Sequence, residues 1–238
     1  MLAVAYVAVF VAALWLPFVH ADAVSRAGAR ASAREVVGEV NWWLASLLLF
    51  NAVNALICVW EIALWVHRDE VQRLNRGYLK KFGKRTLPTP LCLFEHITLA
   101  QALSLKYWSV IFAQYASLDP SYVQHTSWSF WIDVGNGFTT LIPTIALSMA
   151  VTGFPHVPII TAISPRTVGV VAIVMNYQML YGTLGYFANY CYNRYDIGAS
   201  TSAKIVVFAA NVIWILAPLA WIVQGFAFVH ADALAVRW

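Results

Sequence analysis

The sequence predicts an all-α protein: a polytopic membrane helix bundle with five transmembrane helices and one interfacial amphipathic helix. Composition is the first reason, because 61% of the 238 residues are hydrophobic and only 11% are charged. Soluble domains are about 45–50% apolar and about 25% charged. The second reason is five apolar segments that reach the length of about 20 residues needed to cross a bilayer. The third is an aromatic content suited to interfacial belts and an aromatic-lined cavity.

The five spans are expected at roughly 2–20, 42–66, 128–152, 167–192 and 204–229, and together they should form a single membrane domain over 1–238. The first span is short and is expected to end near Pro17. It also resembles a signal peptide, with Val19-His20-Ala21 as the cleavage site. Because it has no basic segment before the apolar run, we interpret it as a retained span.

The segment 90–117 is apolar but carries several polar side chains, which are Glu95, His96, Gln101, Lys106 and Gln114. That mixture favours an amphipathic helix lying in the membrane interface over a sixth span. Pro88 and Pro90 should end any helix that precedes it.

Basic residues gather just after the second span, at Arg68, Arg73, Arg76, Lys80, Lys81, Lys84 and Arg85. Beside a membrane helix, such a cluster sets topology and contacts anionic membrane lipid, so no nucleic acid partner is expected. With five spans, this cluster lies on the same side of the membrane as the N-terminus. Because the side richer in Lys and Arg faces the cytoplasm, the N-terminus is expected in the cytoplasm. The protein is expected in the endoplasmic reticulum membrane if it is eukaryotic and in an inner membrane otherwise.

Neither a metal nor another cofactor is expected. The three cysteines, Cys58, Cys92 and Cys191, lie far apart without a CxxC motif. The sequence also has no HxxxH or HExxH motif and no glycine-rich phosphate loop.

Four of the spans carry polar residues at helical spacing, so that each set shares one face. The sets are Asn51, Asn54, Cys58 and Glu61; Asp133, Asn136, Thr140 and Thr144; Gln178, Tyr181, Gly182, Gly185 and Asn189; and Asn211, Trp214, Pro218 and Trp221. These faces should turn inward, because lipid cannot satisfy polar groups. They could join the helices through hydrogen bonds, or they could surround a mostly apolar cavity. The glycines of the GNG segment, 135–137, are expected to mark a close helix contact.

Glu61 and Asp133 favour the cavity, because an acid inside a span needs a partner, a proton or a function. A protonated acid in an apolar pocket can donate a proton to a substrate, and an ionised one can hold an organic cation. Both are therefore candidate catalytic residues, with Glu61 as the proton donor. Asp133 has a second interpretation as a cap of the third span. The candidate ligand-binding residues are Asn54, Trp60, Asn136, Tyr181, Asn211 and Trp214.

Two motifs near the C-terminus, YGTLGYF at 181–187 and NVIWILAP at 211–218, resemble the EXPERA family, and in particular its sterol Δ8–Δ7 isomerases, the emopamil-binding proteins. The segment YASLDPSYV at 115–123 is similar to that family's entry into its third span. The resemblance covers roughly 45–229 and places Glu61 and Asp133 where the family has its two acids.

The resemblance implies a five-span bundle with a sterol-sized cavity, affinity for cationic amphiphiles, and possible isomerase chemistry. Three positions depart from the isomerase pattern. Ile57 occupies the place of the catalytic His, Asp133 replaces a Glu, and Asn136 replaces a Thr. The loop from 67 to 106 is also longer than the isomerase's.

Four functions follow as hypotheses. The first is a sterol or terpenoid isomerase, in which Glu61 protonates an alkene and Asp133 assists, with aromatic faces stabilising the carbocation. The second is a binding protein for a sterol or cationic amphiphile, without chemistry. The third is a membrane terpene cyclase, since Trp60 and Glu61 form the WE pair that such enzymes carry. The fourth is a structural subunit; a homodimer is a further possibility that the sequence leaves open.

Overall fold

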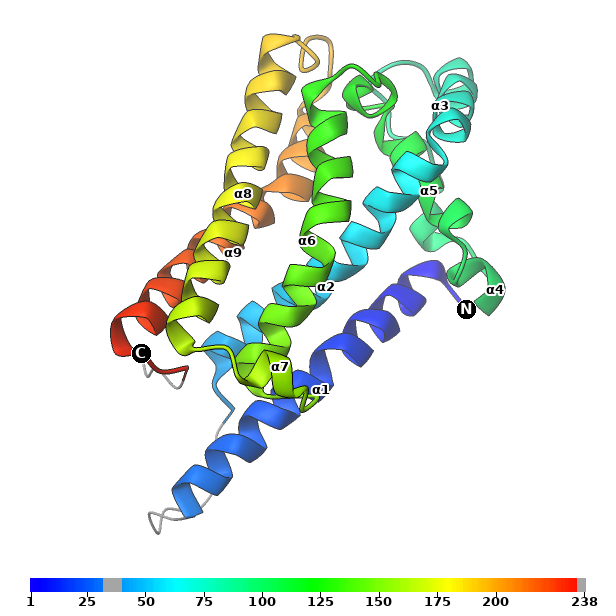
Figure 1. Ribbon diagram of the computed structural model, residues 1–238. Coiled ribbons are helices and arrows are strands. Elements are labelled where there is room, and N and C mark those ends of the chain that lie inside the picture. Colours follow the sequence, from blue (N-terminus) through cyan, green and yellow to red (C-terminus); the bar gives the residue numbers. More distant parts are fainter. Residues whose placement is uncertain (32–39, 235–238) are drawn as a thin grey trace. The chain divides into compact units, whose positions relative to one another are not determined.

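The computed structural model describes residues 1–31 and 40–234, and these residues form helices joined by loops. The long helices are α1 (Ala3–Ala31), α2 (Trp42–Val66), α6 (Trp128–Thr152), α8 (Pro165–Tyr192) and α9 (Thr201–Ala231) (Figure 1). The shorter ones are α3 (Arg68–Phe82), η1 (Cys92–Phe94), α4 (Leu99–Ala102), α5 (Leu105–Tyr115), η2 (Pro120–Val123) and α7 (Pro158–Thr161). The predicted all-α class is confirmed.

Five of these helices are long and apolar enough to cross a membrane, namely Ala3–Ser25, Trp42–Val66, Trp128–Thr152, Pro165–Tyr192 and Thr201–Ala231. The chain is therefore a multi-pass integral membrane protein, as predicted. The expected end of the first span near Pro17 is wrong, because α1 continues past this residue. A proline inside a membrane helix is tolerated, since local adjustments satisfy the backbone groups that it frees.

The segment 90–117 is not one amphipathic helix, which corrects the prediction. It consists of η1, α4 and α5, separated by residues that begin new helices. Thr98 and Ser104 are the N-caps of α4 and α5. Both are extended, and their side chains accept hydrogen bonds from the backbone N–H groups of Gln101 and Tyr107, respectively. Each cap starts a helix with its own axis, so the segment cannot present one continuous apolar face.

The helix α3 was not predicted, because its charged residues indicated only a loop beside the membrane. Its ends nevertheless carry helix signals: Asp69 and Glu70 in the first turn, Lys80 and Lys81 in the last, and Gly83 with a φ of 84° just after it. Its apolar face packs on α5, where Val71 is fully buried and the Asn75 amide donates to the Ala113 carbonyl at 3.0 Å.

The chain divides into two compact units. The first comprises Met1–Ala8, Ile57–Thr139 and Met179–Leu216, and it contains η1, η2, α3, α4 and α5. The second comprises Val9–Leu56, Thr140–Gln178 and Ala217–Trp238. Each unit contains a portion of α1, α2, α6, α8 and α9.

In the second unit, the polar faces join helices by hydrogen bonds. Asn51 donates to Ser148 at 2.9 Å and Asn54 donates to Thr144 at 3.0 Å, with all four side chains buried between α2 and α6. Here the interpretation as interhelical hydrogen bonding is confirmed, and such bonds contribute about 0.6 kcal/mol each on average.

Small residues bring two further helices of the second unit together. A Cβ placed on Gly169 of α8 would lie 2.6 Å from the carbonyl oxygen of Gly225 in α9, and one on Gly225 would lie 2.8 Å from that of Gly169. Neither position has room for a side chain. This is the close backbone approach that small residues permit between membrane helices.

Candidate functional site

A cavity opens inside the first unit among the ends of α2 and α8, the starts of α6 and α9, and α5 with η2. The centre of a water molecule can occupy about 160 Å³ of it, and the space that no atom fills, with the open solvent at its mouth included, is about 770 Å³. The first of these volumes is smaller than the range of about 300–1,000 Å³ that is typical of ligand pockets. The lining is mostly apolar and aromatic, with a few polar groups.

Two carboxyl groups face this cavity. Glu61 of α2 is only 5% exposed, and Asp133 of α6 is half-buried. The two are close enough to interact electrostatically. Among the described residues, Glu61 Oε2 has no hydrogen-bond partner, and the lining of the cavity contains no Lys, Arg or His. Because no cationic side chain lines the cavity, the negative charge of these two acids must be neutralised by a cationic ligand or by a bound proton.

Glu61 is held where it is by Gly137. A Cβ at Gly137 would lie 2.9 Å from both the Cys58 carbonyl oxygen and Glu61 Cβ, so only glycine lets α6 approach α2 at this level. A Cβ at Gly135 would meet nothing within 4 Å. The predicted close helix contact in the GNG segment is therefore made by Gly137 and not by Gly135.

Indole rings line the cavity beside Glu61. Trp60 is buried and stacks on Trp108 of α5, with ring centroids 4.9 Å apart and planes inclined by 20°. Within the described part of the chain, its Nε1 has no hydrogen-bond partner. Trp214 of α9 contributes a second indole to the lining. Aromatic faces attract cations and can stabilise a carbocation.

Three tyrosines form another part of the wall. The hydroxyl groups of Tyr115 and Tyr186 are 3.2 Å apart, and the Asn211 amide donates to the Tyr115 hydroxyl at 2.9 Å. Tyr122 packs edge-on against Tyr115 at 5.1 Å and lies within hydrogen-bonding reach of Asp133. Burial raises the pKa of Tyr115 and of Tyr122, so both stay protonated and can donate hydrogen bonds.

A third acid, Asp119, is fully buried and lies within hydrogen-bonding reach of Tyr186. It begins η2, where its side chain accepts a hydrogen bond from the Ser121 backbone N–H at 3.0 Å. Burial raises the pKa of the Asp119 carboxyl group. The turn that Asp119 caps carries Tyr122, so this acid positions a tyrosine of the cavity without lining it.

Six of the eight predicted site residues meet at the cavity, namely Trp60, Glu61, Asp133, Asn136, Asn211 and Trp214. The other two lie elsewhere. Asn54 belongs to the second unit, where it donates to Thr144. Tyr181 is 55% exposed and packs edge-on against Trp128, with centroids 6.5 Å apart. The side of α8 that faces the cavity carries Thr183 and Tyr186 instead.

The structure also corrects the interpretation of Asp133 as a helix cap. Helix α6 begins at Trp128, so Asp133 lies more than one turn inside it, beyond the reach of the unpaired N–H groups. The Lys and Arg residues closest in sequence to the two acids lie on helices, since Arg68 begins α3 and Lys106 lies in α5.

Sequence reasoning missed the other residues of the lining, which are Ile57, Ile111, Phe112, Tyr115, Tyr122, Ile132, Thr183, Tyr186 and Ala210. Tyr115 and Tyr122 stand in the YASLDPSYV segment that carries the EXPERA resemblance, which was a usable signal. The apolar residues gave none, because an isoleucine facing a cavity looks like one facing lipid. Ile57, which the EXPERA resemblance aligns with a catalytic His, lines the cavity one helical turn from Glu61.

Comparison with known proteins gave no match to a protein-family model, a curated protein or a solved structure. Among the described residues, no group of three or more His, Cys, Asp or Glu side chains could hold a metal ion.

Proposed function

We propose that this protein binds a sterol or terpenoid in the cavity of the first unit and moves a double bond in it by acid–base chemistry. One observation carries the proposal: Glu61 and Asp133 share an aromatic-lined cavity whose lining contains no basic residue. The EXPERA-like motifs support it, because Asn211, Trp214 and Tyr186 of those motifs lie in the lining.

In the proposed reaction, the Glu61 carboxyl group transfers its proton to one carbon of an alkene. The electron pair of the double bond forms the new C–H bond, and the cation left on the neighbouring carbon faces Trp60 and Trp214. A base, Asp133, then takes a proton from the next carbon, and that C–H pair forms the shifted double bond. One proton enters and one leaves, so the reaction needs no cofactor.

The experiment is turnover of a Δ8-sterol by purified protein in deuterated buffer, followed by mass spectrometry. Wild type should return a sterol with a shifted double bond and one deuterium on carbon. Glu61→Gln keeps the size of the side chain but removes the acid, so it should lower turnover by at least about 100-fold, at the lower end for a general acid. Glu95→Gln, at an exposed position outside the cavity, is the matched control and should retain wild-type turnover. Turnover retained by Glu61→Gln would exclude Glu61 as the donor.

A second function, binding without chemistry, is favoured by Ile57. An aliphatic side chain stands at the position where the isomerases have their catalytic His, and it can neither donate nor accept a proton. In this case the acids hold a sterol hydroxyl group or an amine. The same experiment separates the two functions, since a binding protein returns its sterol unchanged and without deuterium. A membrane terpene cyclase would instead act on an epoxide-bearing prenylated substrate.

We propose that the protein resides in the endoplasmic reticulum membrane if it is eukaryotic and in an inner membrane otherwise.

A further inference from the structure

Helix α3 continues almost directly from the span α2. The His67 backbone N–H donates to the Ala63 carbonyl, and the Val71 N–H donates to the His67 carbonyl. Its first residue, Arg68, is therefore at the membrane surface, with only His67 between it and the end of the span at Val66.

The far end of α3 returns to the same surface. Beyond Gly83, the Arg85 backbone N–H donates to the Ser117 carbonyl at 3.0 Å. Lys84 and Arg85 also line a notch with Ser200 and Ser202, at the start of the span α9, in which the centre of a water molecule can occupy about 370 Å³. Because both ends of α3 lie beside the ends of spans in the same unit, the helix runs along the membrane surface.

The apolar face of α3 is already covered by protein. Val71 and Asn75 are buried against α5, and the Gln72 amide donates to the Val123 carbonyl at 3.3 Å. This distinguishes α3 from an interfacial helix that sinks its apolar side into lipid. Only its opposite side is free for a partner.

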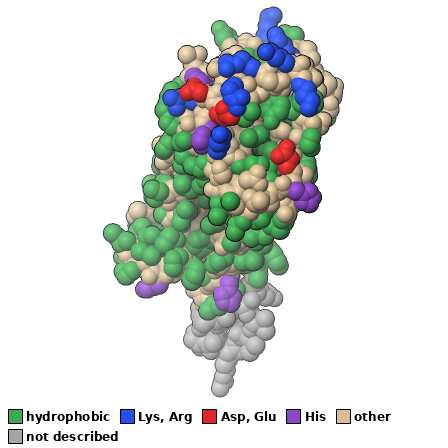
Figure 2. Space-filling model, turned by 90° about the vertical axis from the view of Figure 1, so that its right-hand side faces the viewer, with side chains coloured by type: hydrophobic (Ala, Val, Ile, Leu, Met, Phe, Trp, Pro, Cys, Tyr) green, Lys and Arg blue, Asp and Glu red, His purple; other side chains and the backbone are tan. Residues whose placement is uncertain are grey.

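That opposite side is positively charged. Arg76, Lys80 and Lys81 of α3 are exposed, as is Lys84 just beyond its end, and these four are here called the basic face. Figure 2 shows Lys and Arg side chains gathered at one end of the molecular face that it presents. Within the described part of the chain, no acidic side chain forms an ion pair with any of these four.

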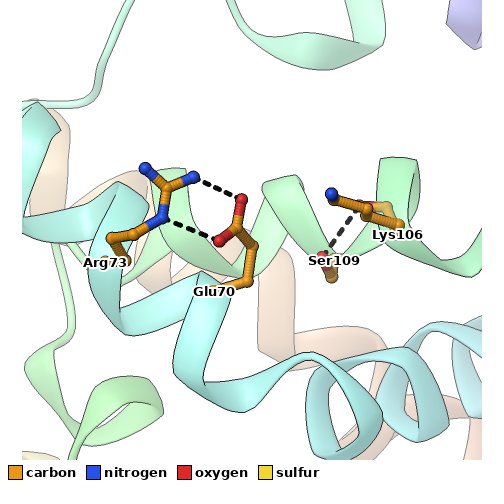
Figure 3. Close-up of polar contacts among 4 residues, drawn as sticks. All are labelled: Glu70, Arg73, Lys106 and Ser109. Carbon is orange, nitrogen blue, oxygen red and sulfur yellow. Dashed lines mark hydrogen bonds and ion pairs between the residues drawn. The ribbon is translucent and has the colours of Figure 1, made fainter.

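The other charges of α3 are already engaged. Arg73 holds the Glu70 carboxylate with two hydrogen bonds, of 2.8 and 2.5 Å, and Lys106 of α5 lies on the other side of Glu70 (Figure 3). The hydrogen bond from Arg73 lowers the pKa of Glu70, so this carboxyl group stays ionised and already has a cationic partner. Arg68 lies over the Trp65 ring. The only remaining acid of the helix is Asp69.

We propose that the basic face of α3, together with the notch beside Lys84 and Arg85, binds the anionic headgroups of phospholipids in the surrounding leaflet. Arg76 donates a hydrogen bond to Gln72, but within the described structure no carboxylate forms an ion pair with any cation of the basic face. These cations lie at the membrane surface, and the one acid of α3 that Arg73 does not hold is Asp69. Lys and Arg side chains at this depth attract anionic lipid, and each adds to the affinity. The proposal is independent of what the cavity binds.

The test uses purified full-length protein titrated with short-chain phosphatidylserine or phosphatidylcholine, with binding read by native mass spectrometry. Wild type should prefer phosphatidylserine. The triple variant Arg76→Gln, Lys80→Gln, Lys81→Gln should bind phosphatidylserine about tenfold or more weakly, with phosphatidylcholine unchanged. Asp69→Asn, which removes a negative charge, should bind phosphatidylserine more tightly than wild type.

Gel filtration and circular dichroism verify that each variant is folded. Unchanged phosphatidylserine affinity in the triple variant would overturn the proposal. So would competition by inorganic phosphate at concentrations equal to those of the lipid, which would assign the face to free phosphate. Binding of an RNA oligonucleotide in preference to phosphatidylserine would likewise contradict it.

Discussion

At the residue scale, the cavity wall depends on a few hydroxyl and carboxyl groups with defined partners. The Tyr115 hydroxyl joins three elements, because it accepts from Asn211 of α9 and lies 3.2 Å from the Tyr186 hydroxyl of α8. The sequence indicated Asn211 through its motif. It could not indicate that Tyr115, 96 residues away, is its partner, because nothing in a single sequence records a contact over that distance.

Tyr115→Phe should therefore loosen the cavity wall. The substitution keeps the ring but leaves the buried Tyr186 hydroxyl group and the Asn211 amide without this partner, which costs about 1–3 kcal/mol of stability. The melting temperature in detergent, together with the affinity for a sterol, measures the effect. Tyr192→Phe, at a position 86% exposed, is the control and should change neither. Equal behaviour of the two variants would contradict the role assigned to Tyr115.

Asp119 makes stability depend on pH. Burial raises the pKa of this carboxyl group in the folded state, so in the window from the ordinary Asp value of 3.8 up to the folded pKa the native state binds more protons than the unfolded state. Stability should consequently fall as pH rises through that window.

Asp119→Asn cannot ionise but can still accept the Ser121 N–H hydrogen bond, so it should narrow the difference between melting temperatures at pH 5 and pH 8. Asp69→Asn, on the exposed side of α3, should leave the wild-type difference intact. A difference that is as large in Asp119→Asn as in wild type would show that this group does not carry the effect.

At the element scale, the long helices followed from hydropathy and the short ones did not. Four of the spans have nearly the predicted bounds, because an apolar run of this length has only one way to satisfy its backbone in lipid. The segment 68–117 was predicted poorly, since α3 and α5 pack on each other as in a soluble protein. In this segment, capping residues such as Thr98 and Ser104 determine where helices begin. A hydropathy average over many residues does not detect such single positions.

The contact between α2 and α6 gives a sharp test at this scale. Gly137→Ala places a methyl group 2.9 Å from the Cys58 carbonyl oxygen and from Glu61 Cβ, so the helices must separate. Overpacking of this kind costs about 1–3 kcal/mol and should also displace Glu61 and weaken sterol binding. Gly135→Ala, two residues away in open space, should be neutral or stabilising by up to about 1 kcal/mol. Thermal unfolding and sterol titration of the pair decide the matter; equal effects would contradict the packing described here.

At the scale of the whole molecule, the polar faces of the spans have two uses. In the second unit, Asn51 and Asn54 meet hydrogen-bond partners and join helices. In the first unit, the same face of α2 presents Glu61 to a cavity. The polar face of α2 thus forms interhelical hydrogen bonds in one part and lines a cavity in the other. The spacing of polar residues could not separate these two interpretations, because it shows which side of a helix is polar and not what that side contacts.

In the proposed function, a sterol or terpenoid occupies the cavity beside Glu61 and Asp133. The most direct measurement is photo-cross-linking of a diazirine-bearing sterol to the purified protein, with peptide mapping and competition by excess unlabelled sterol. We predict competed labels on the lining residues of 57–61, 111–122, 132–136 and 210–214. Competed labels confined to exposed residues of α8, such as Val170, Val174 and Tyr177, would contradict the claim and assign sterol contact to the lipid-facing surface.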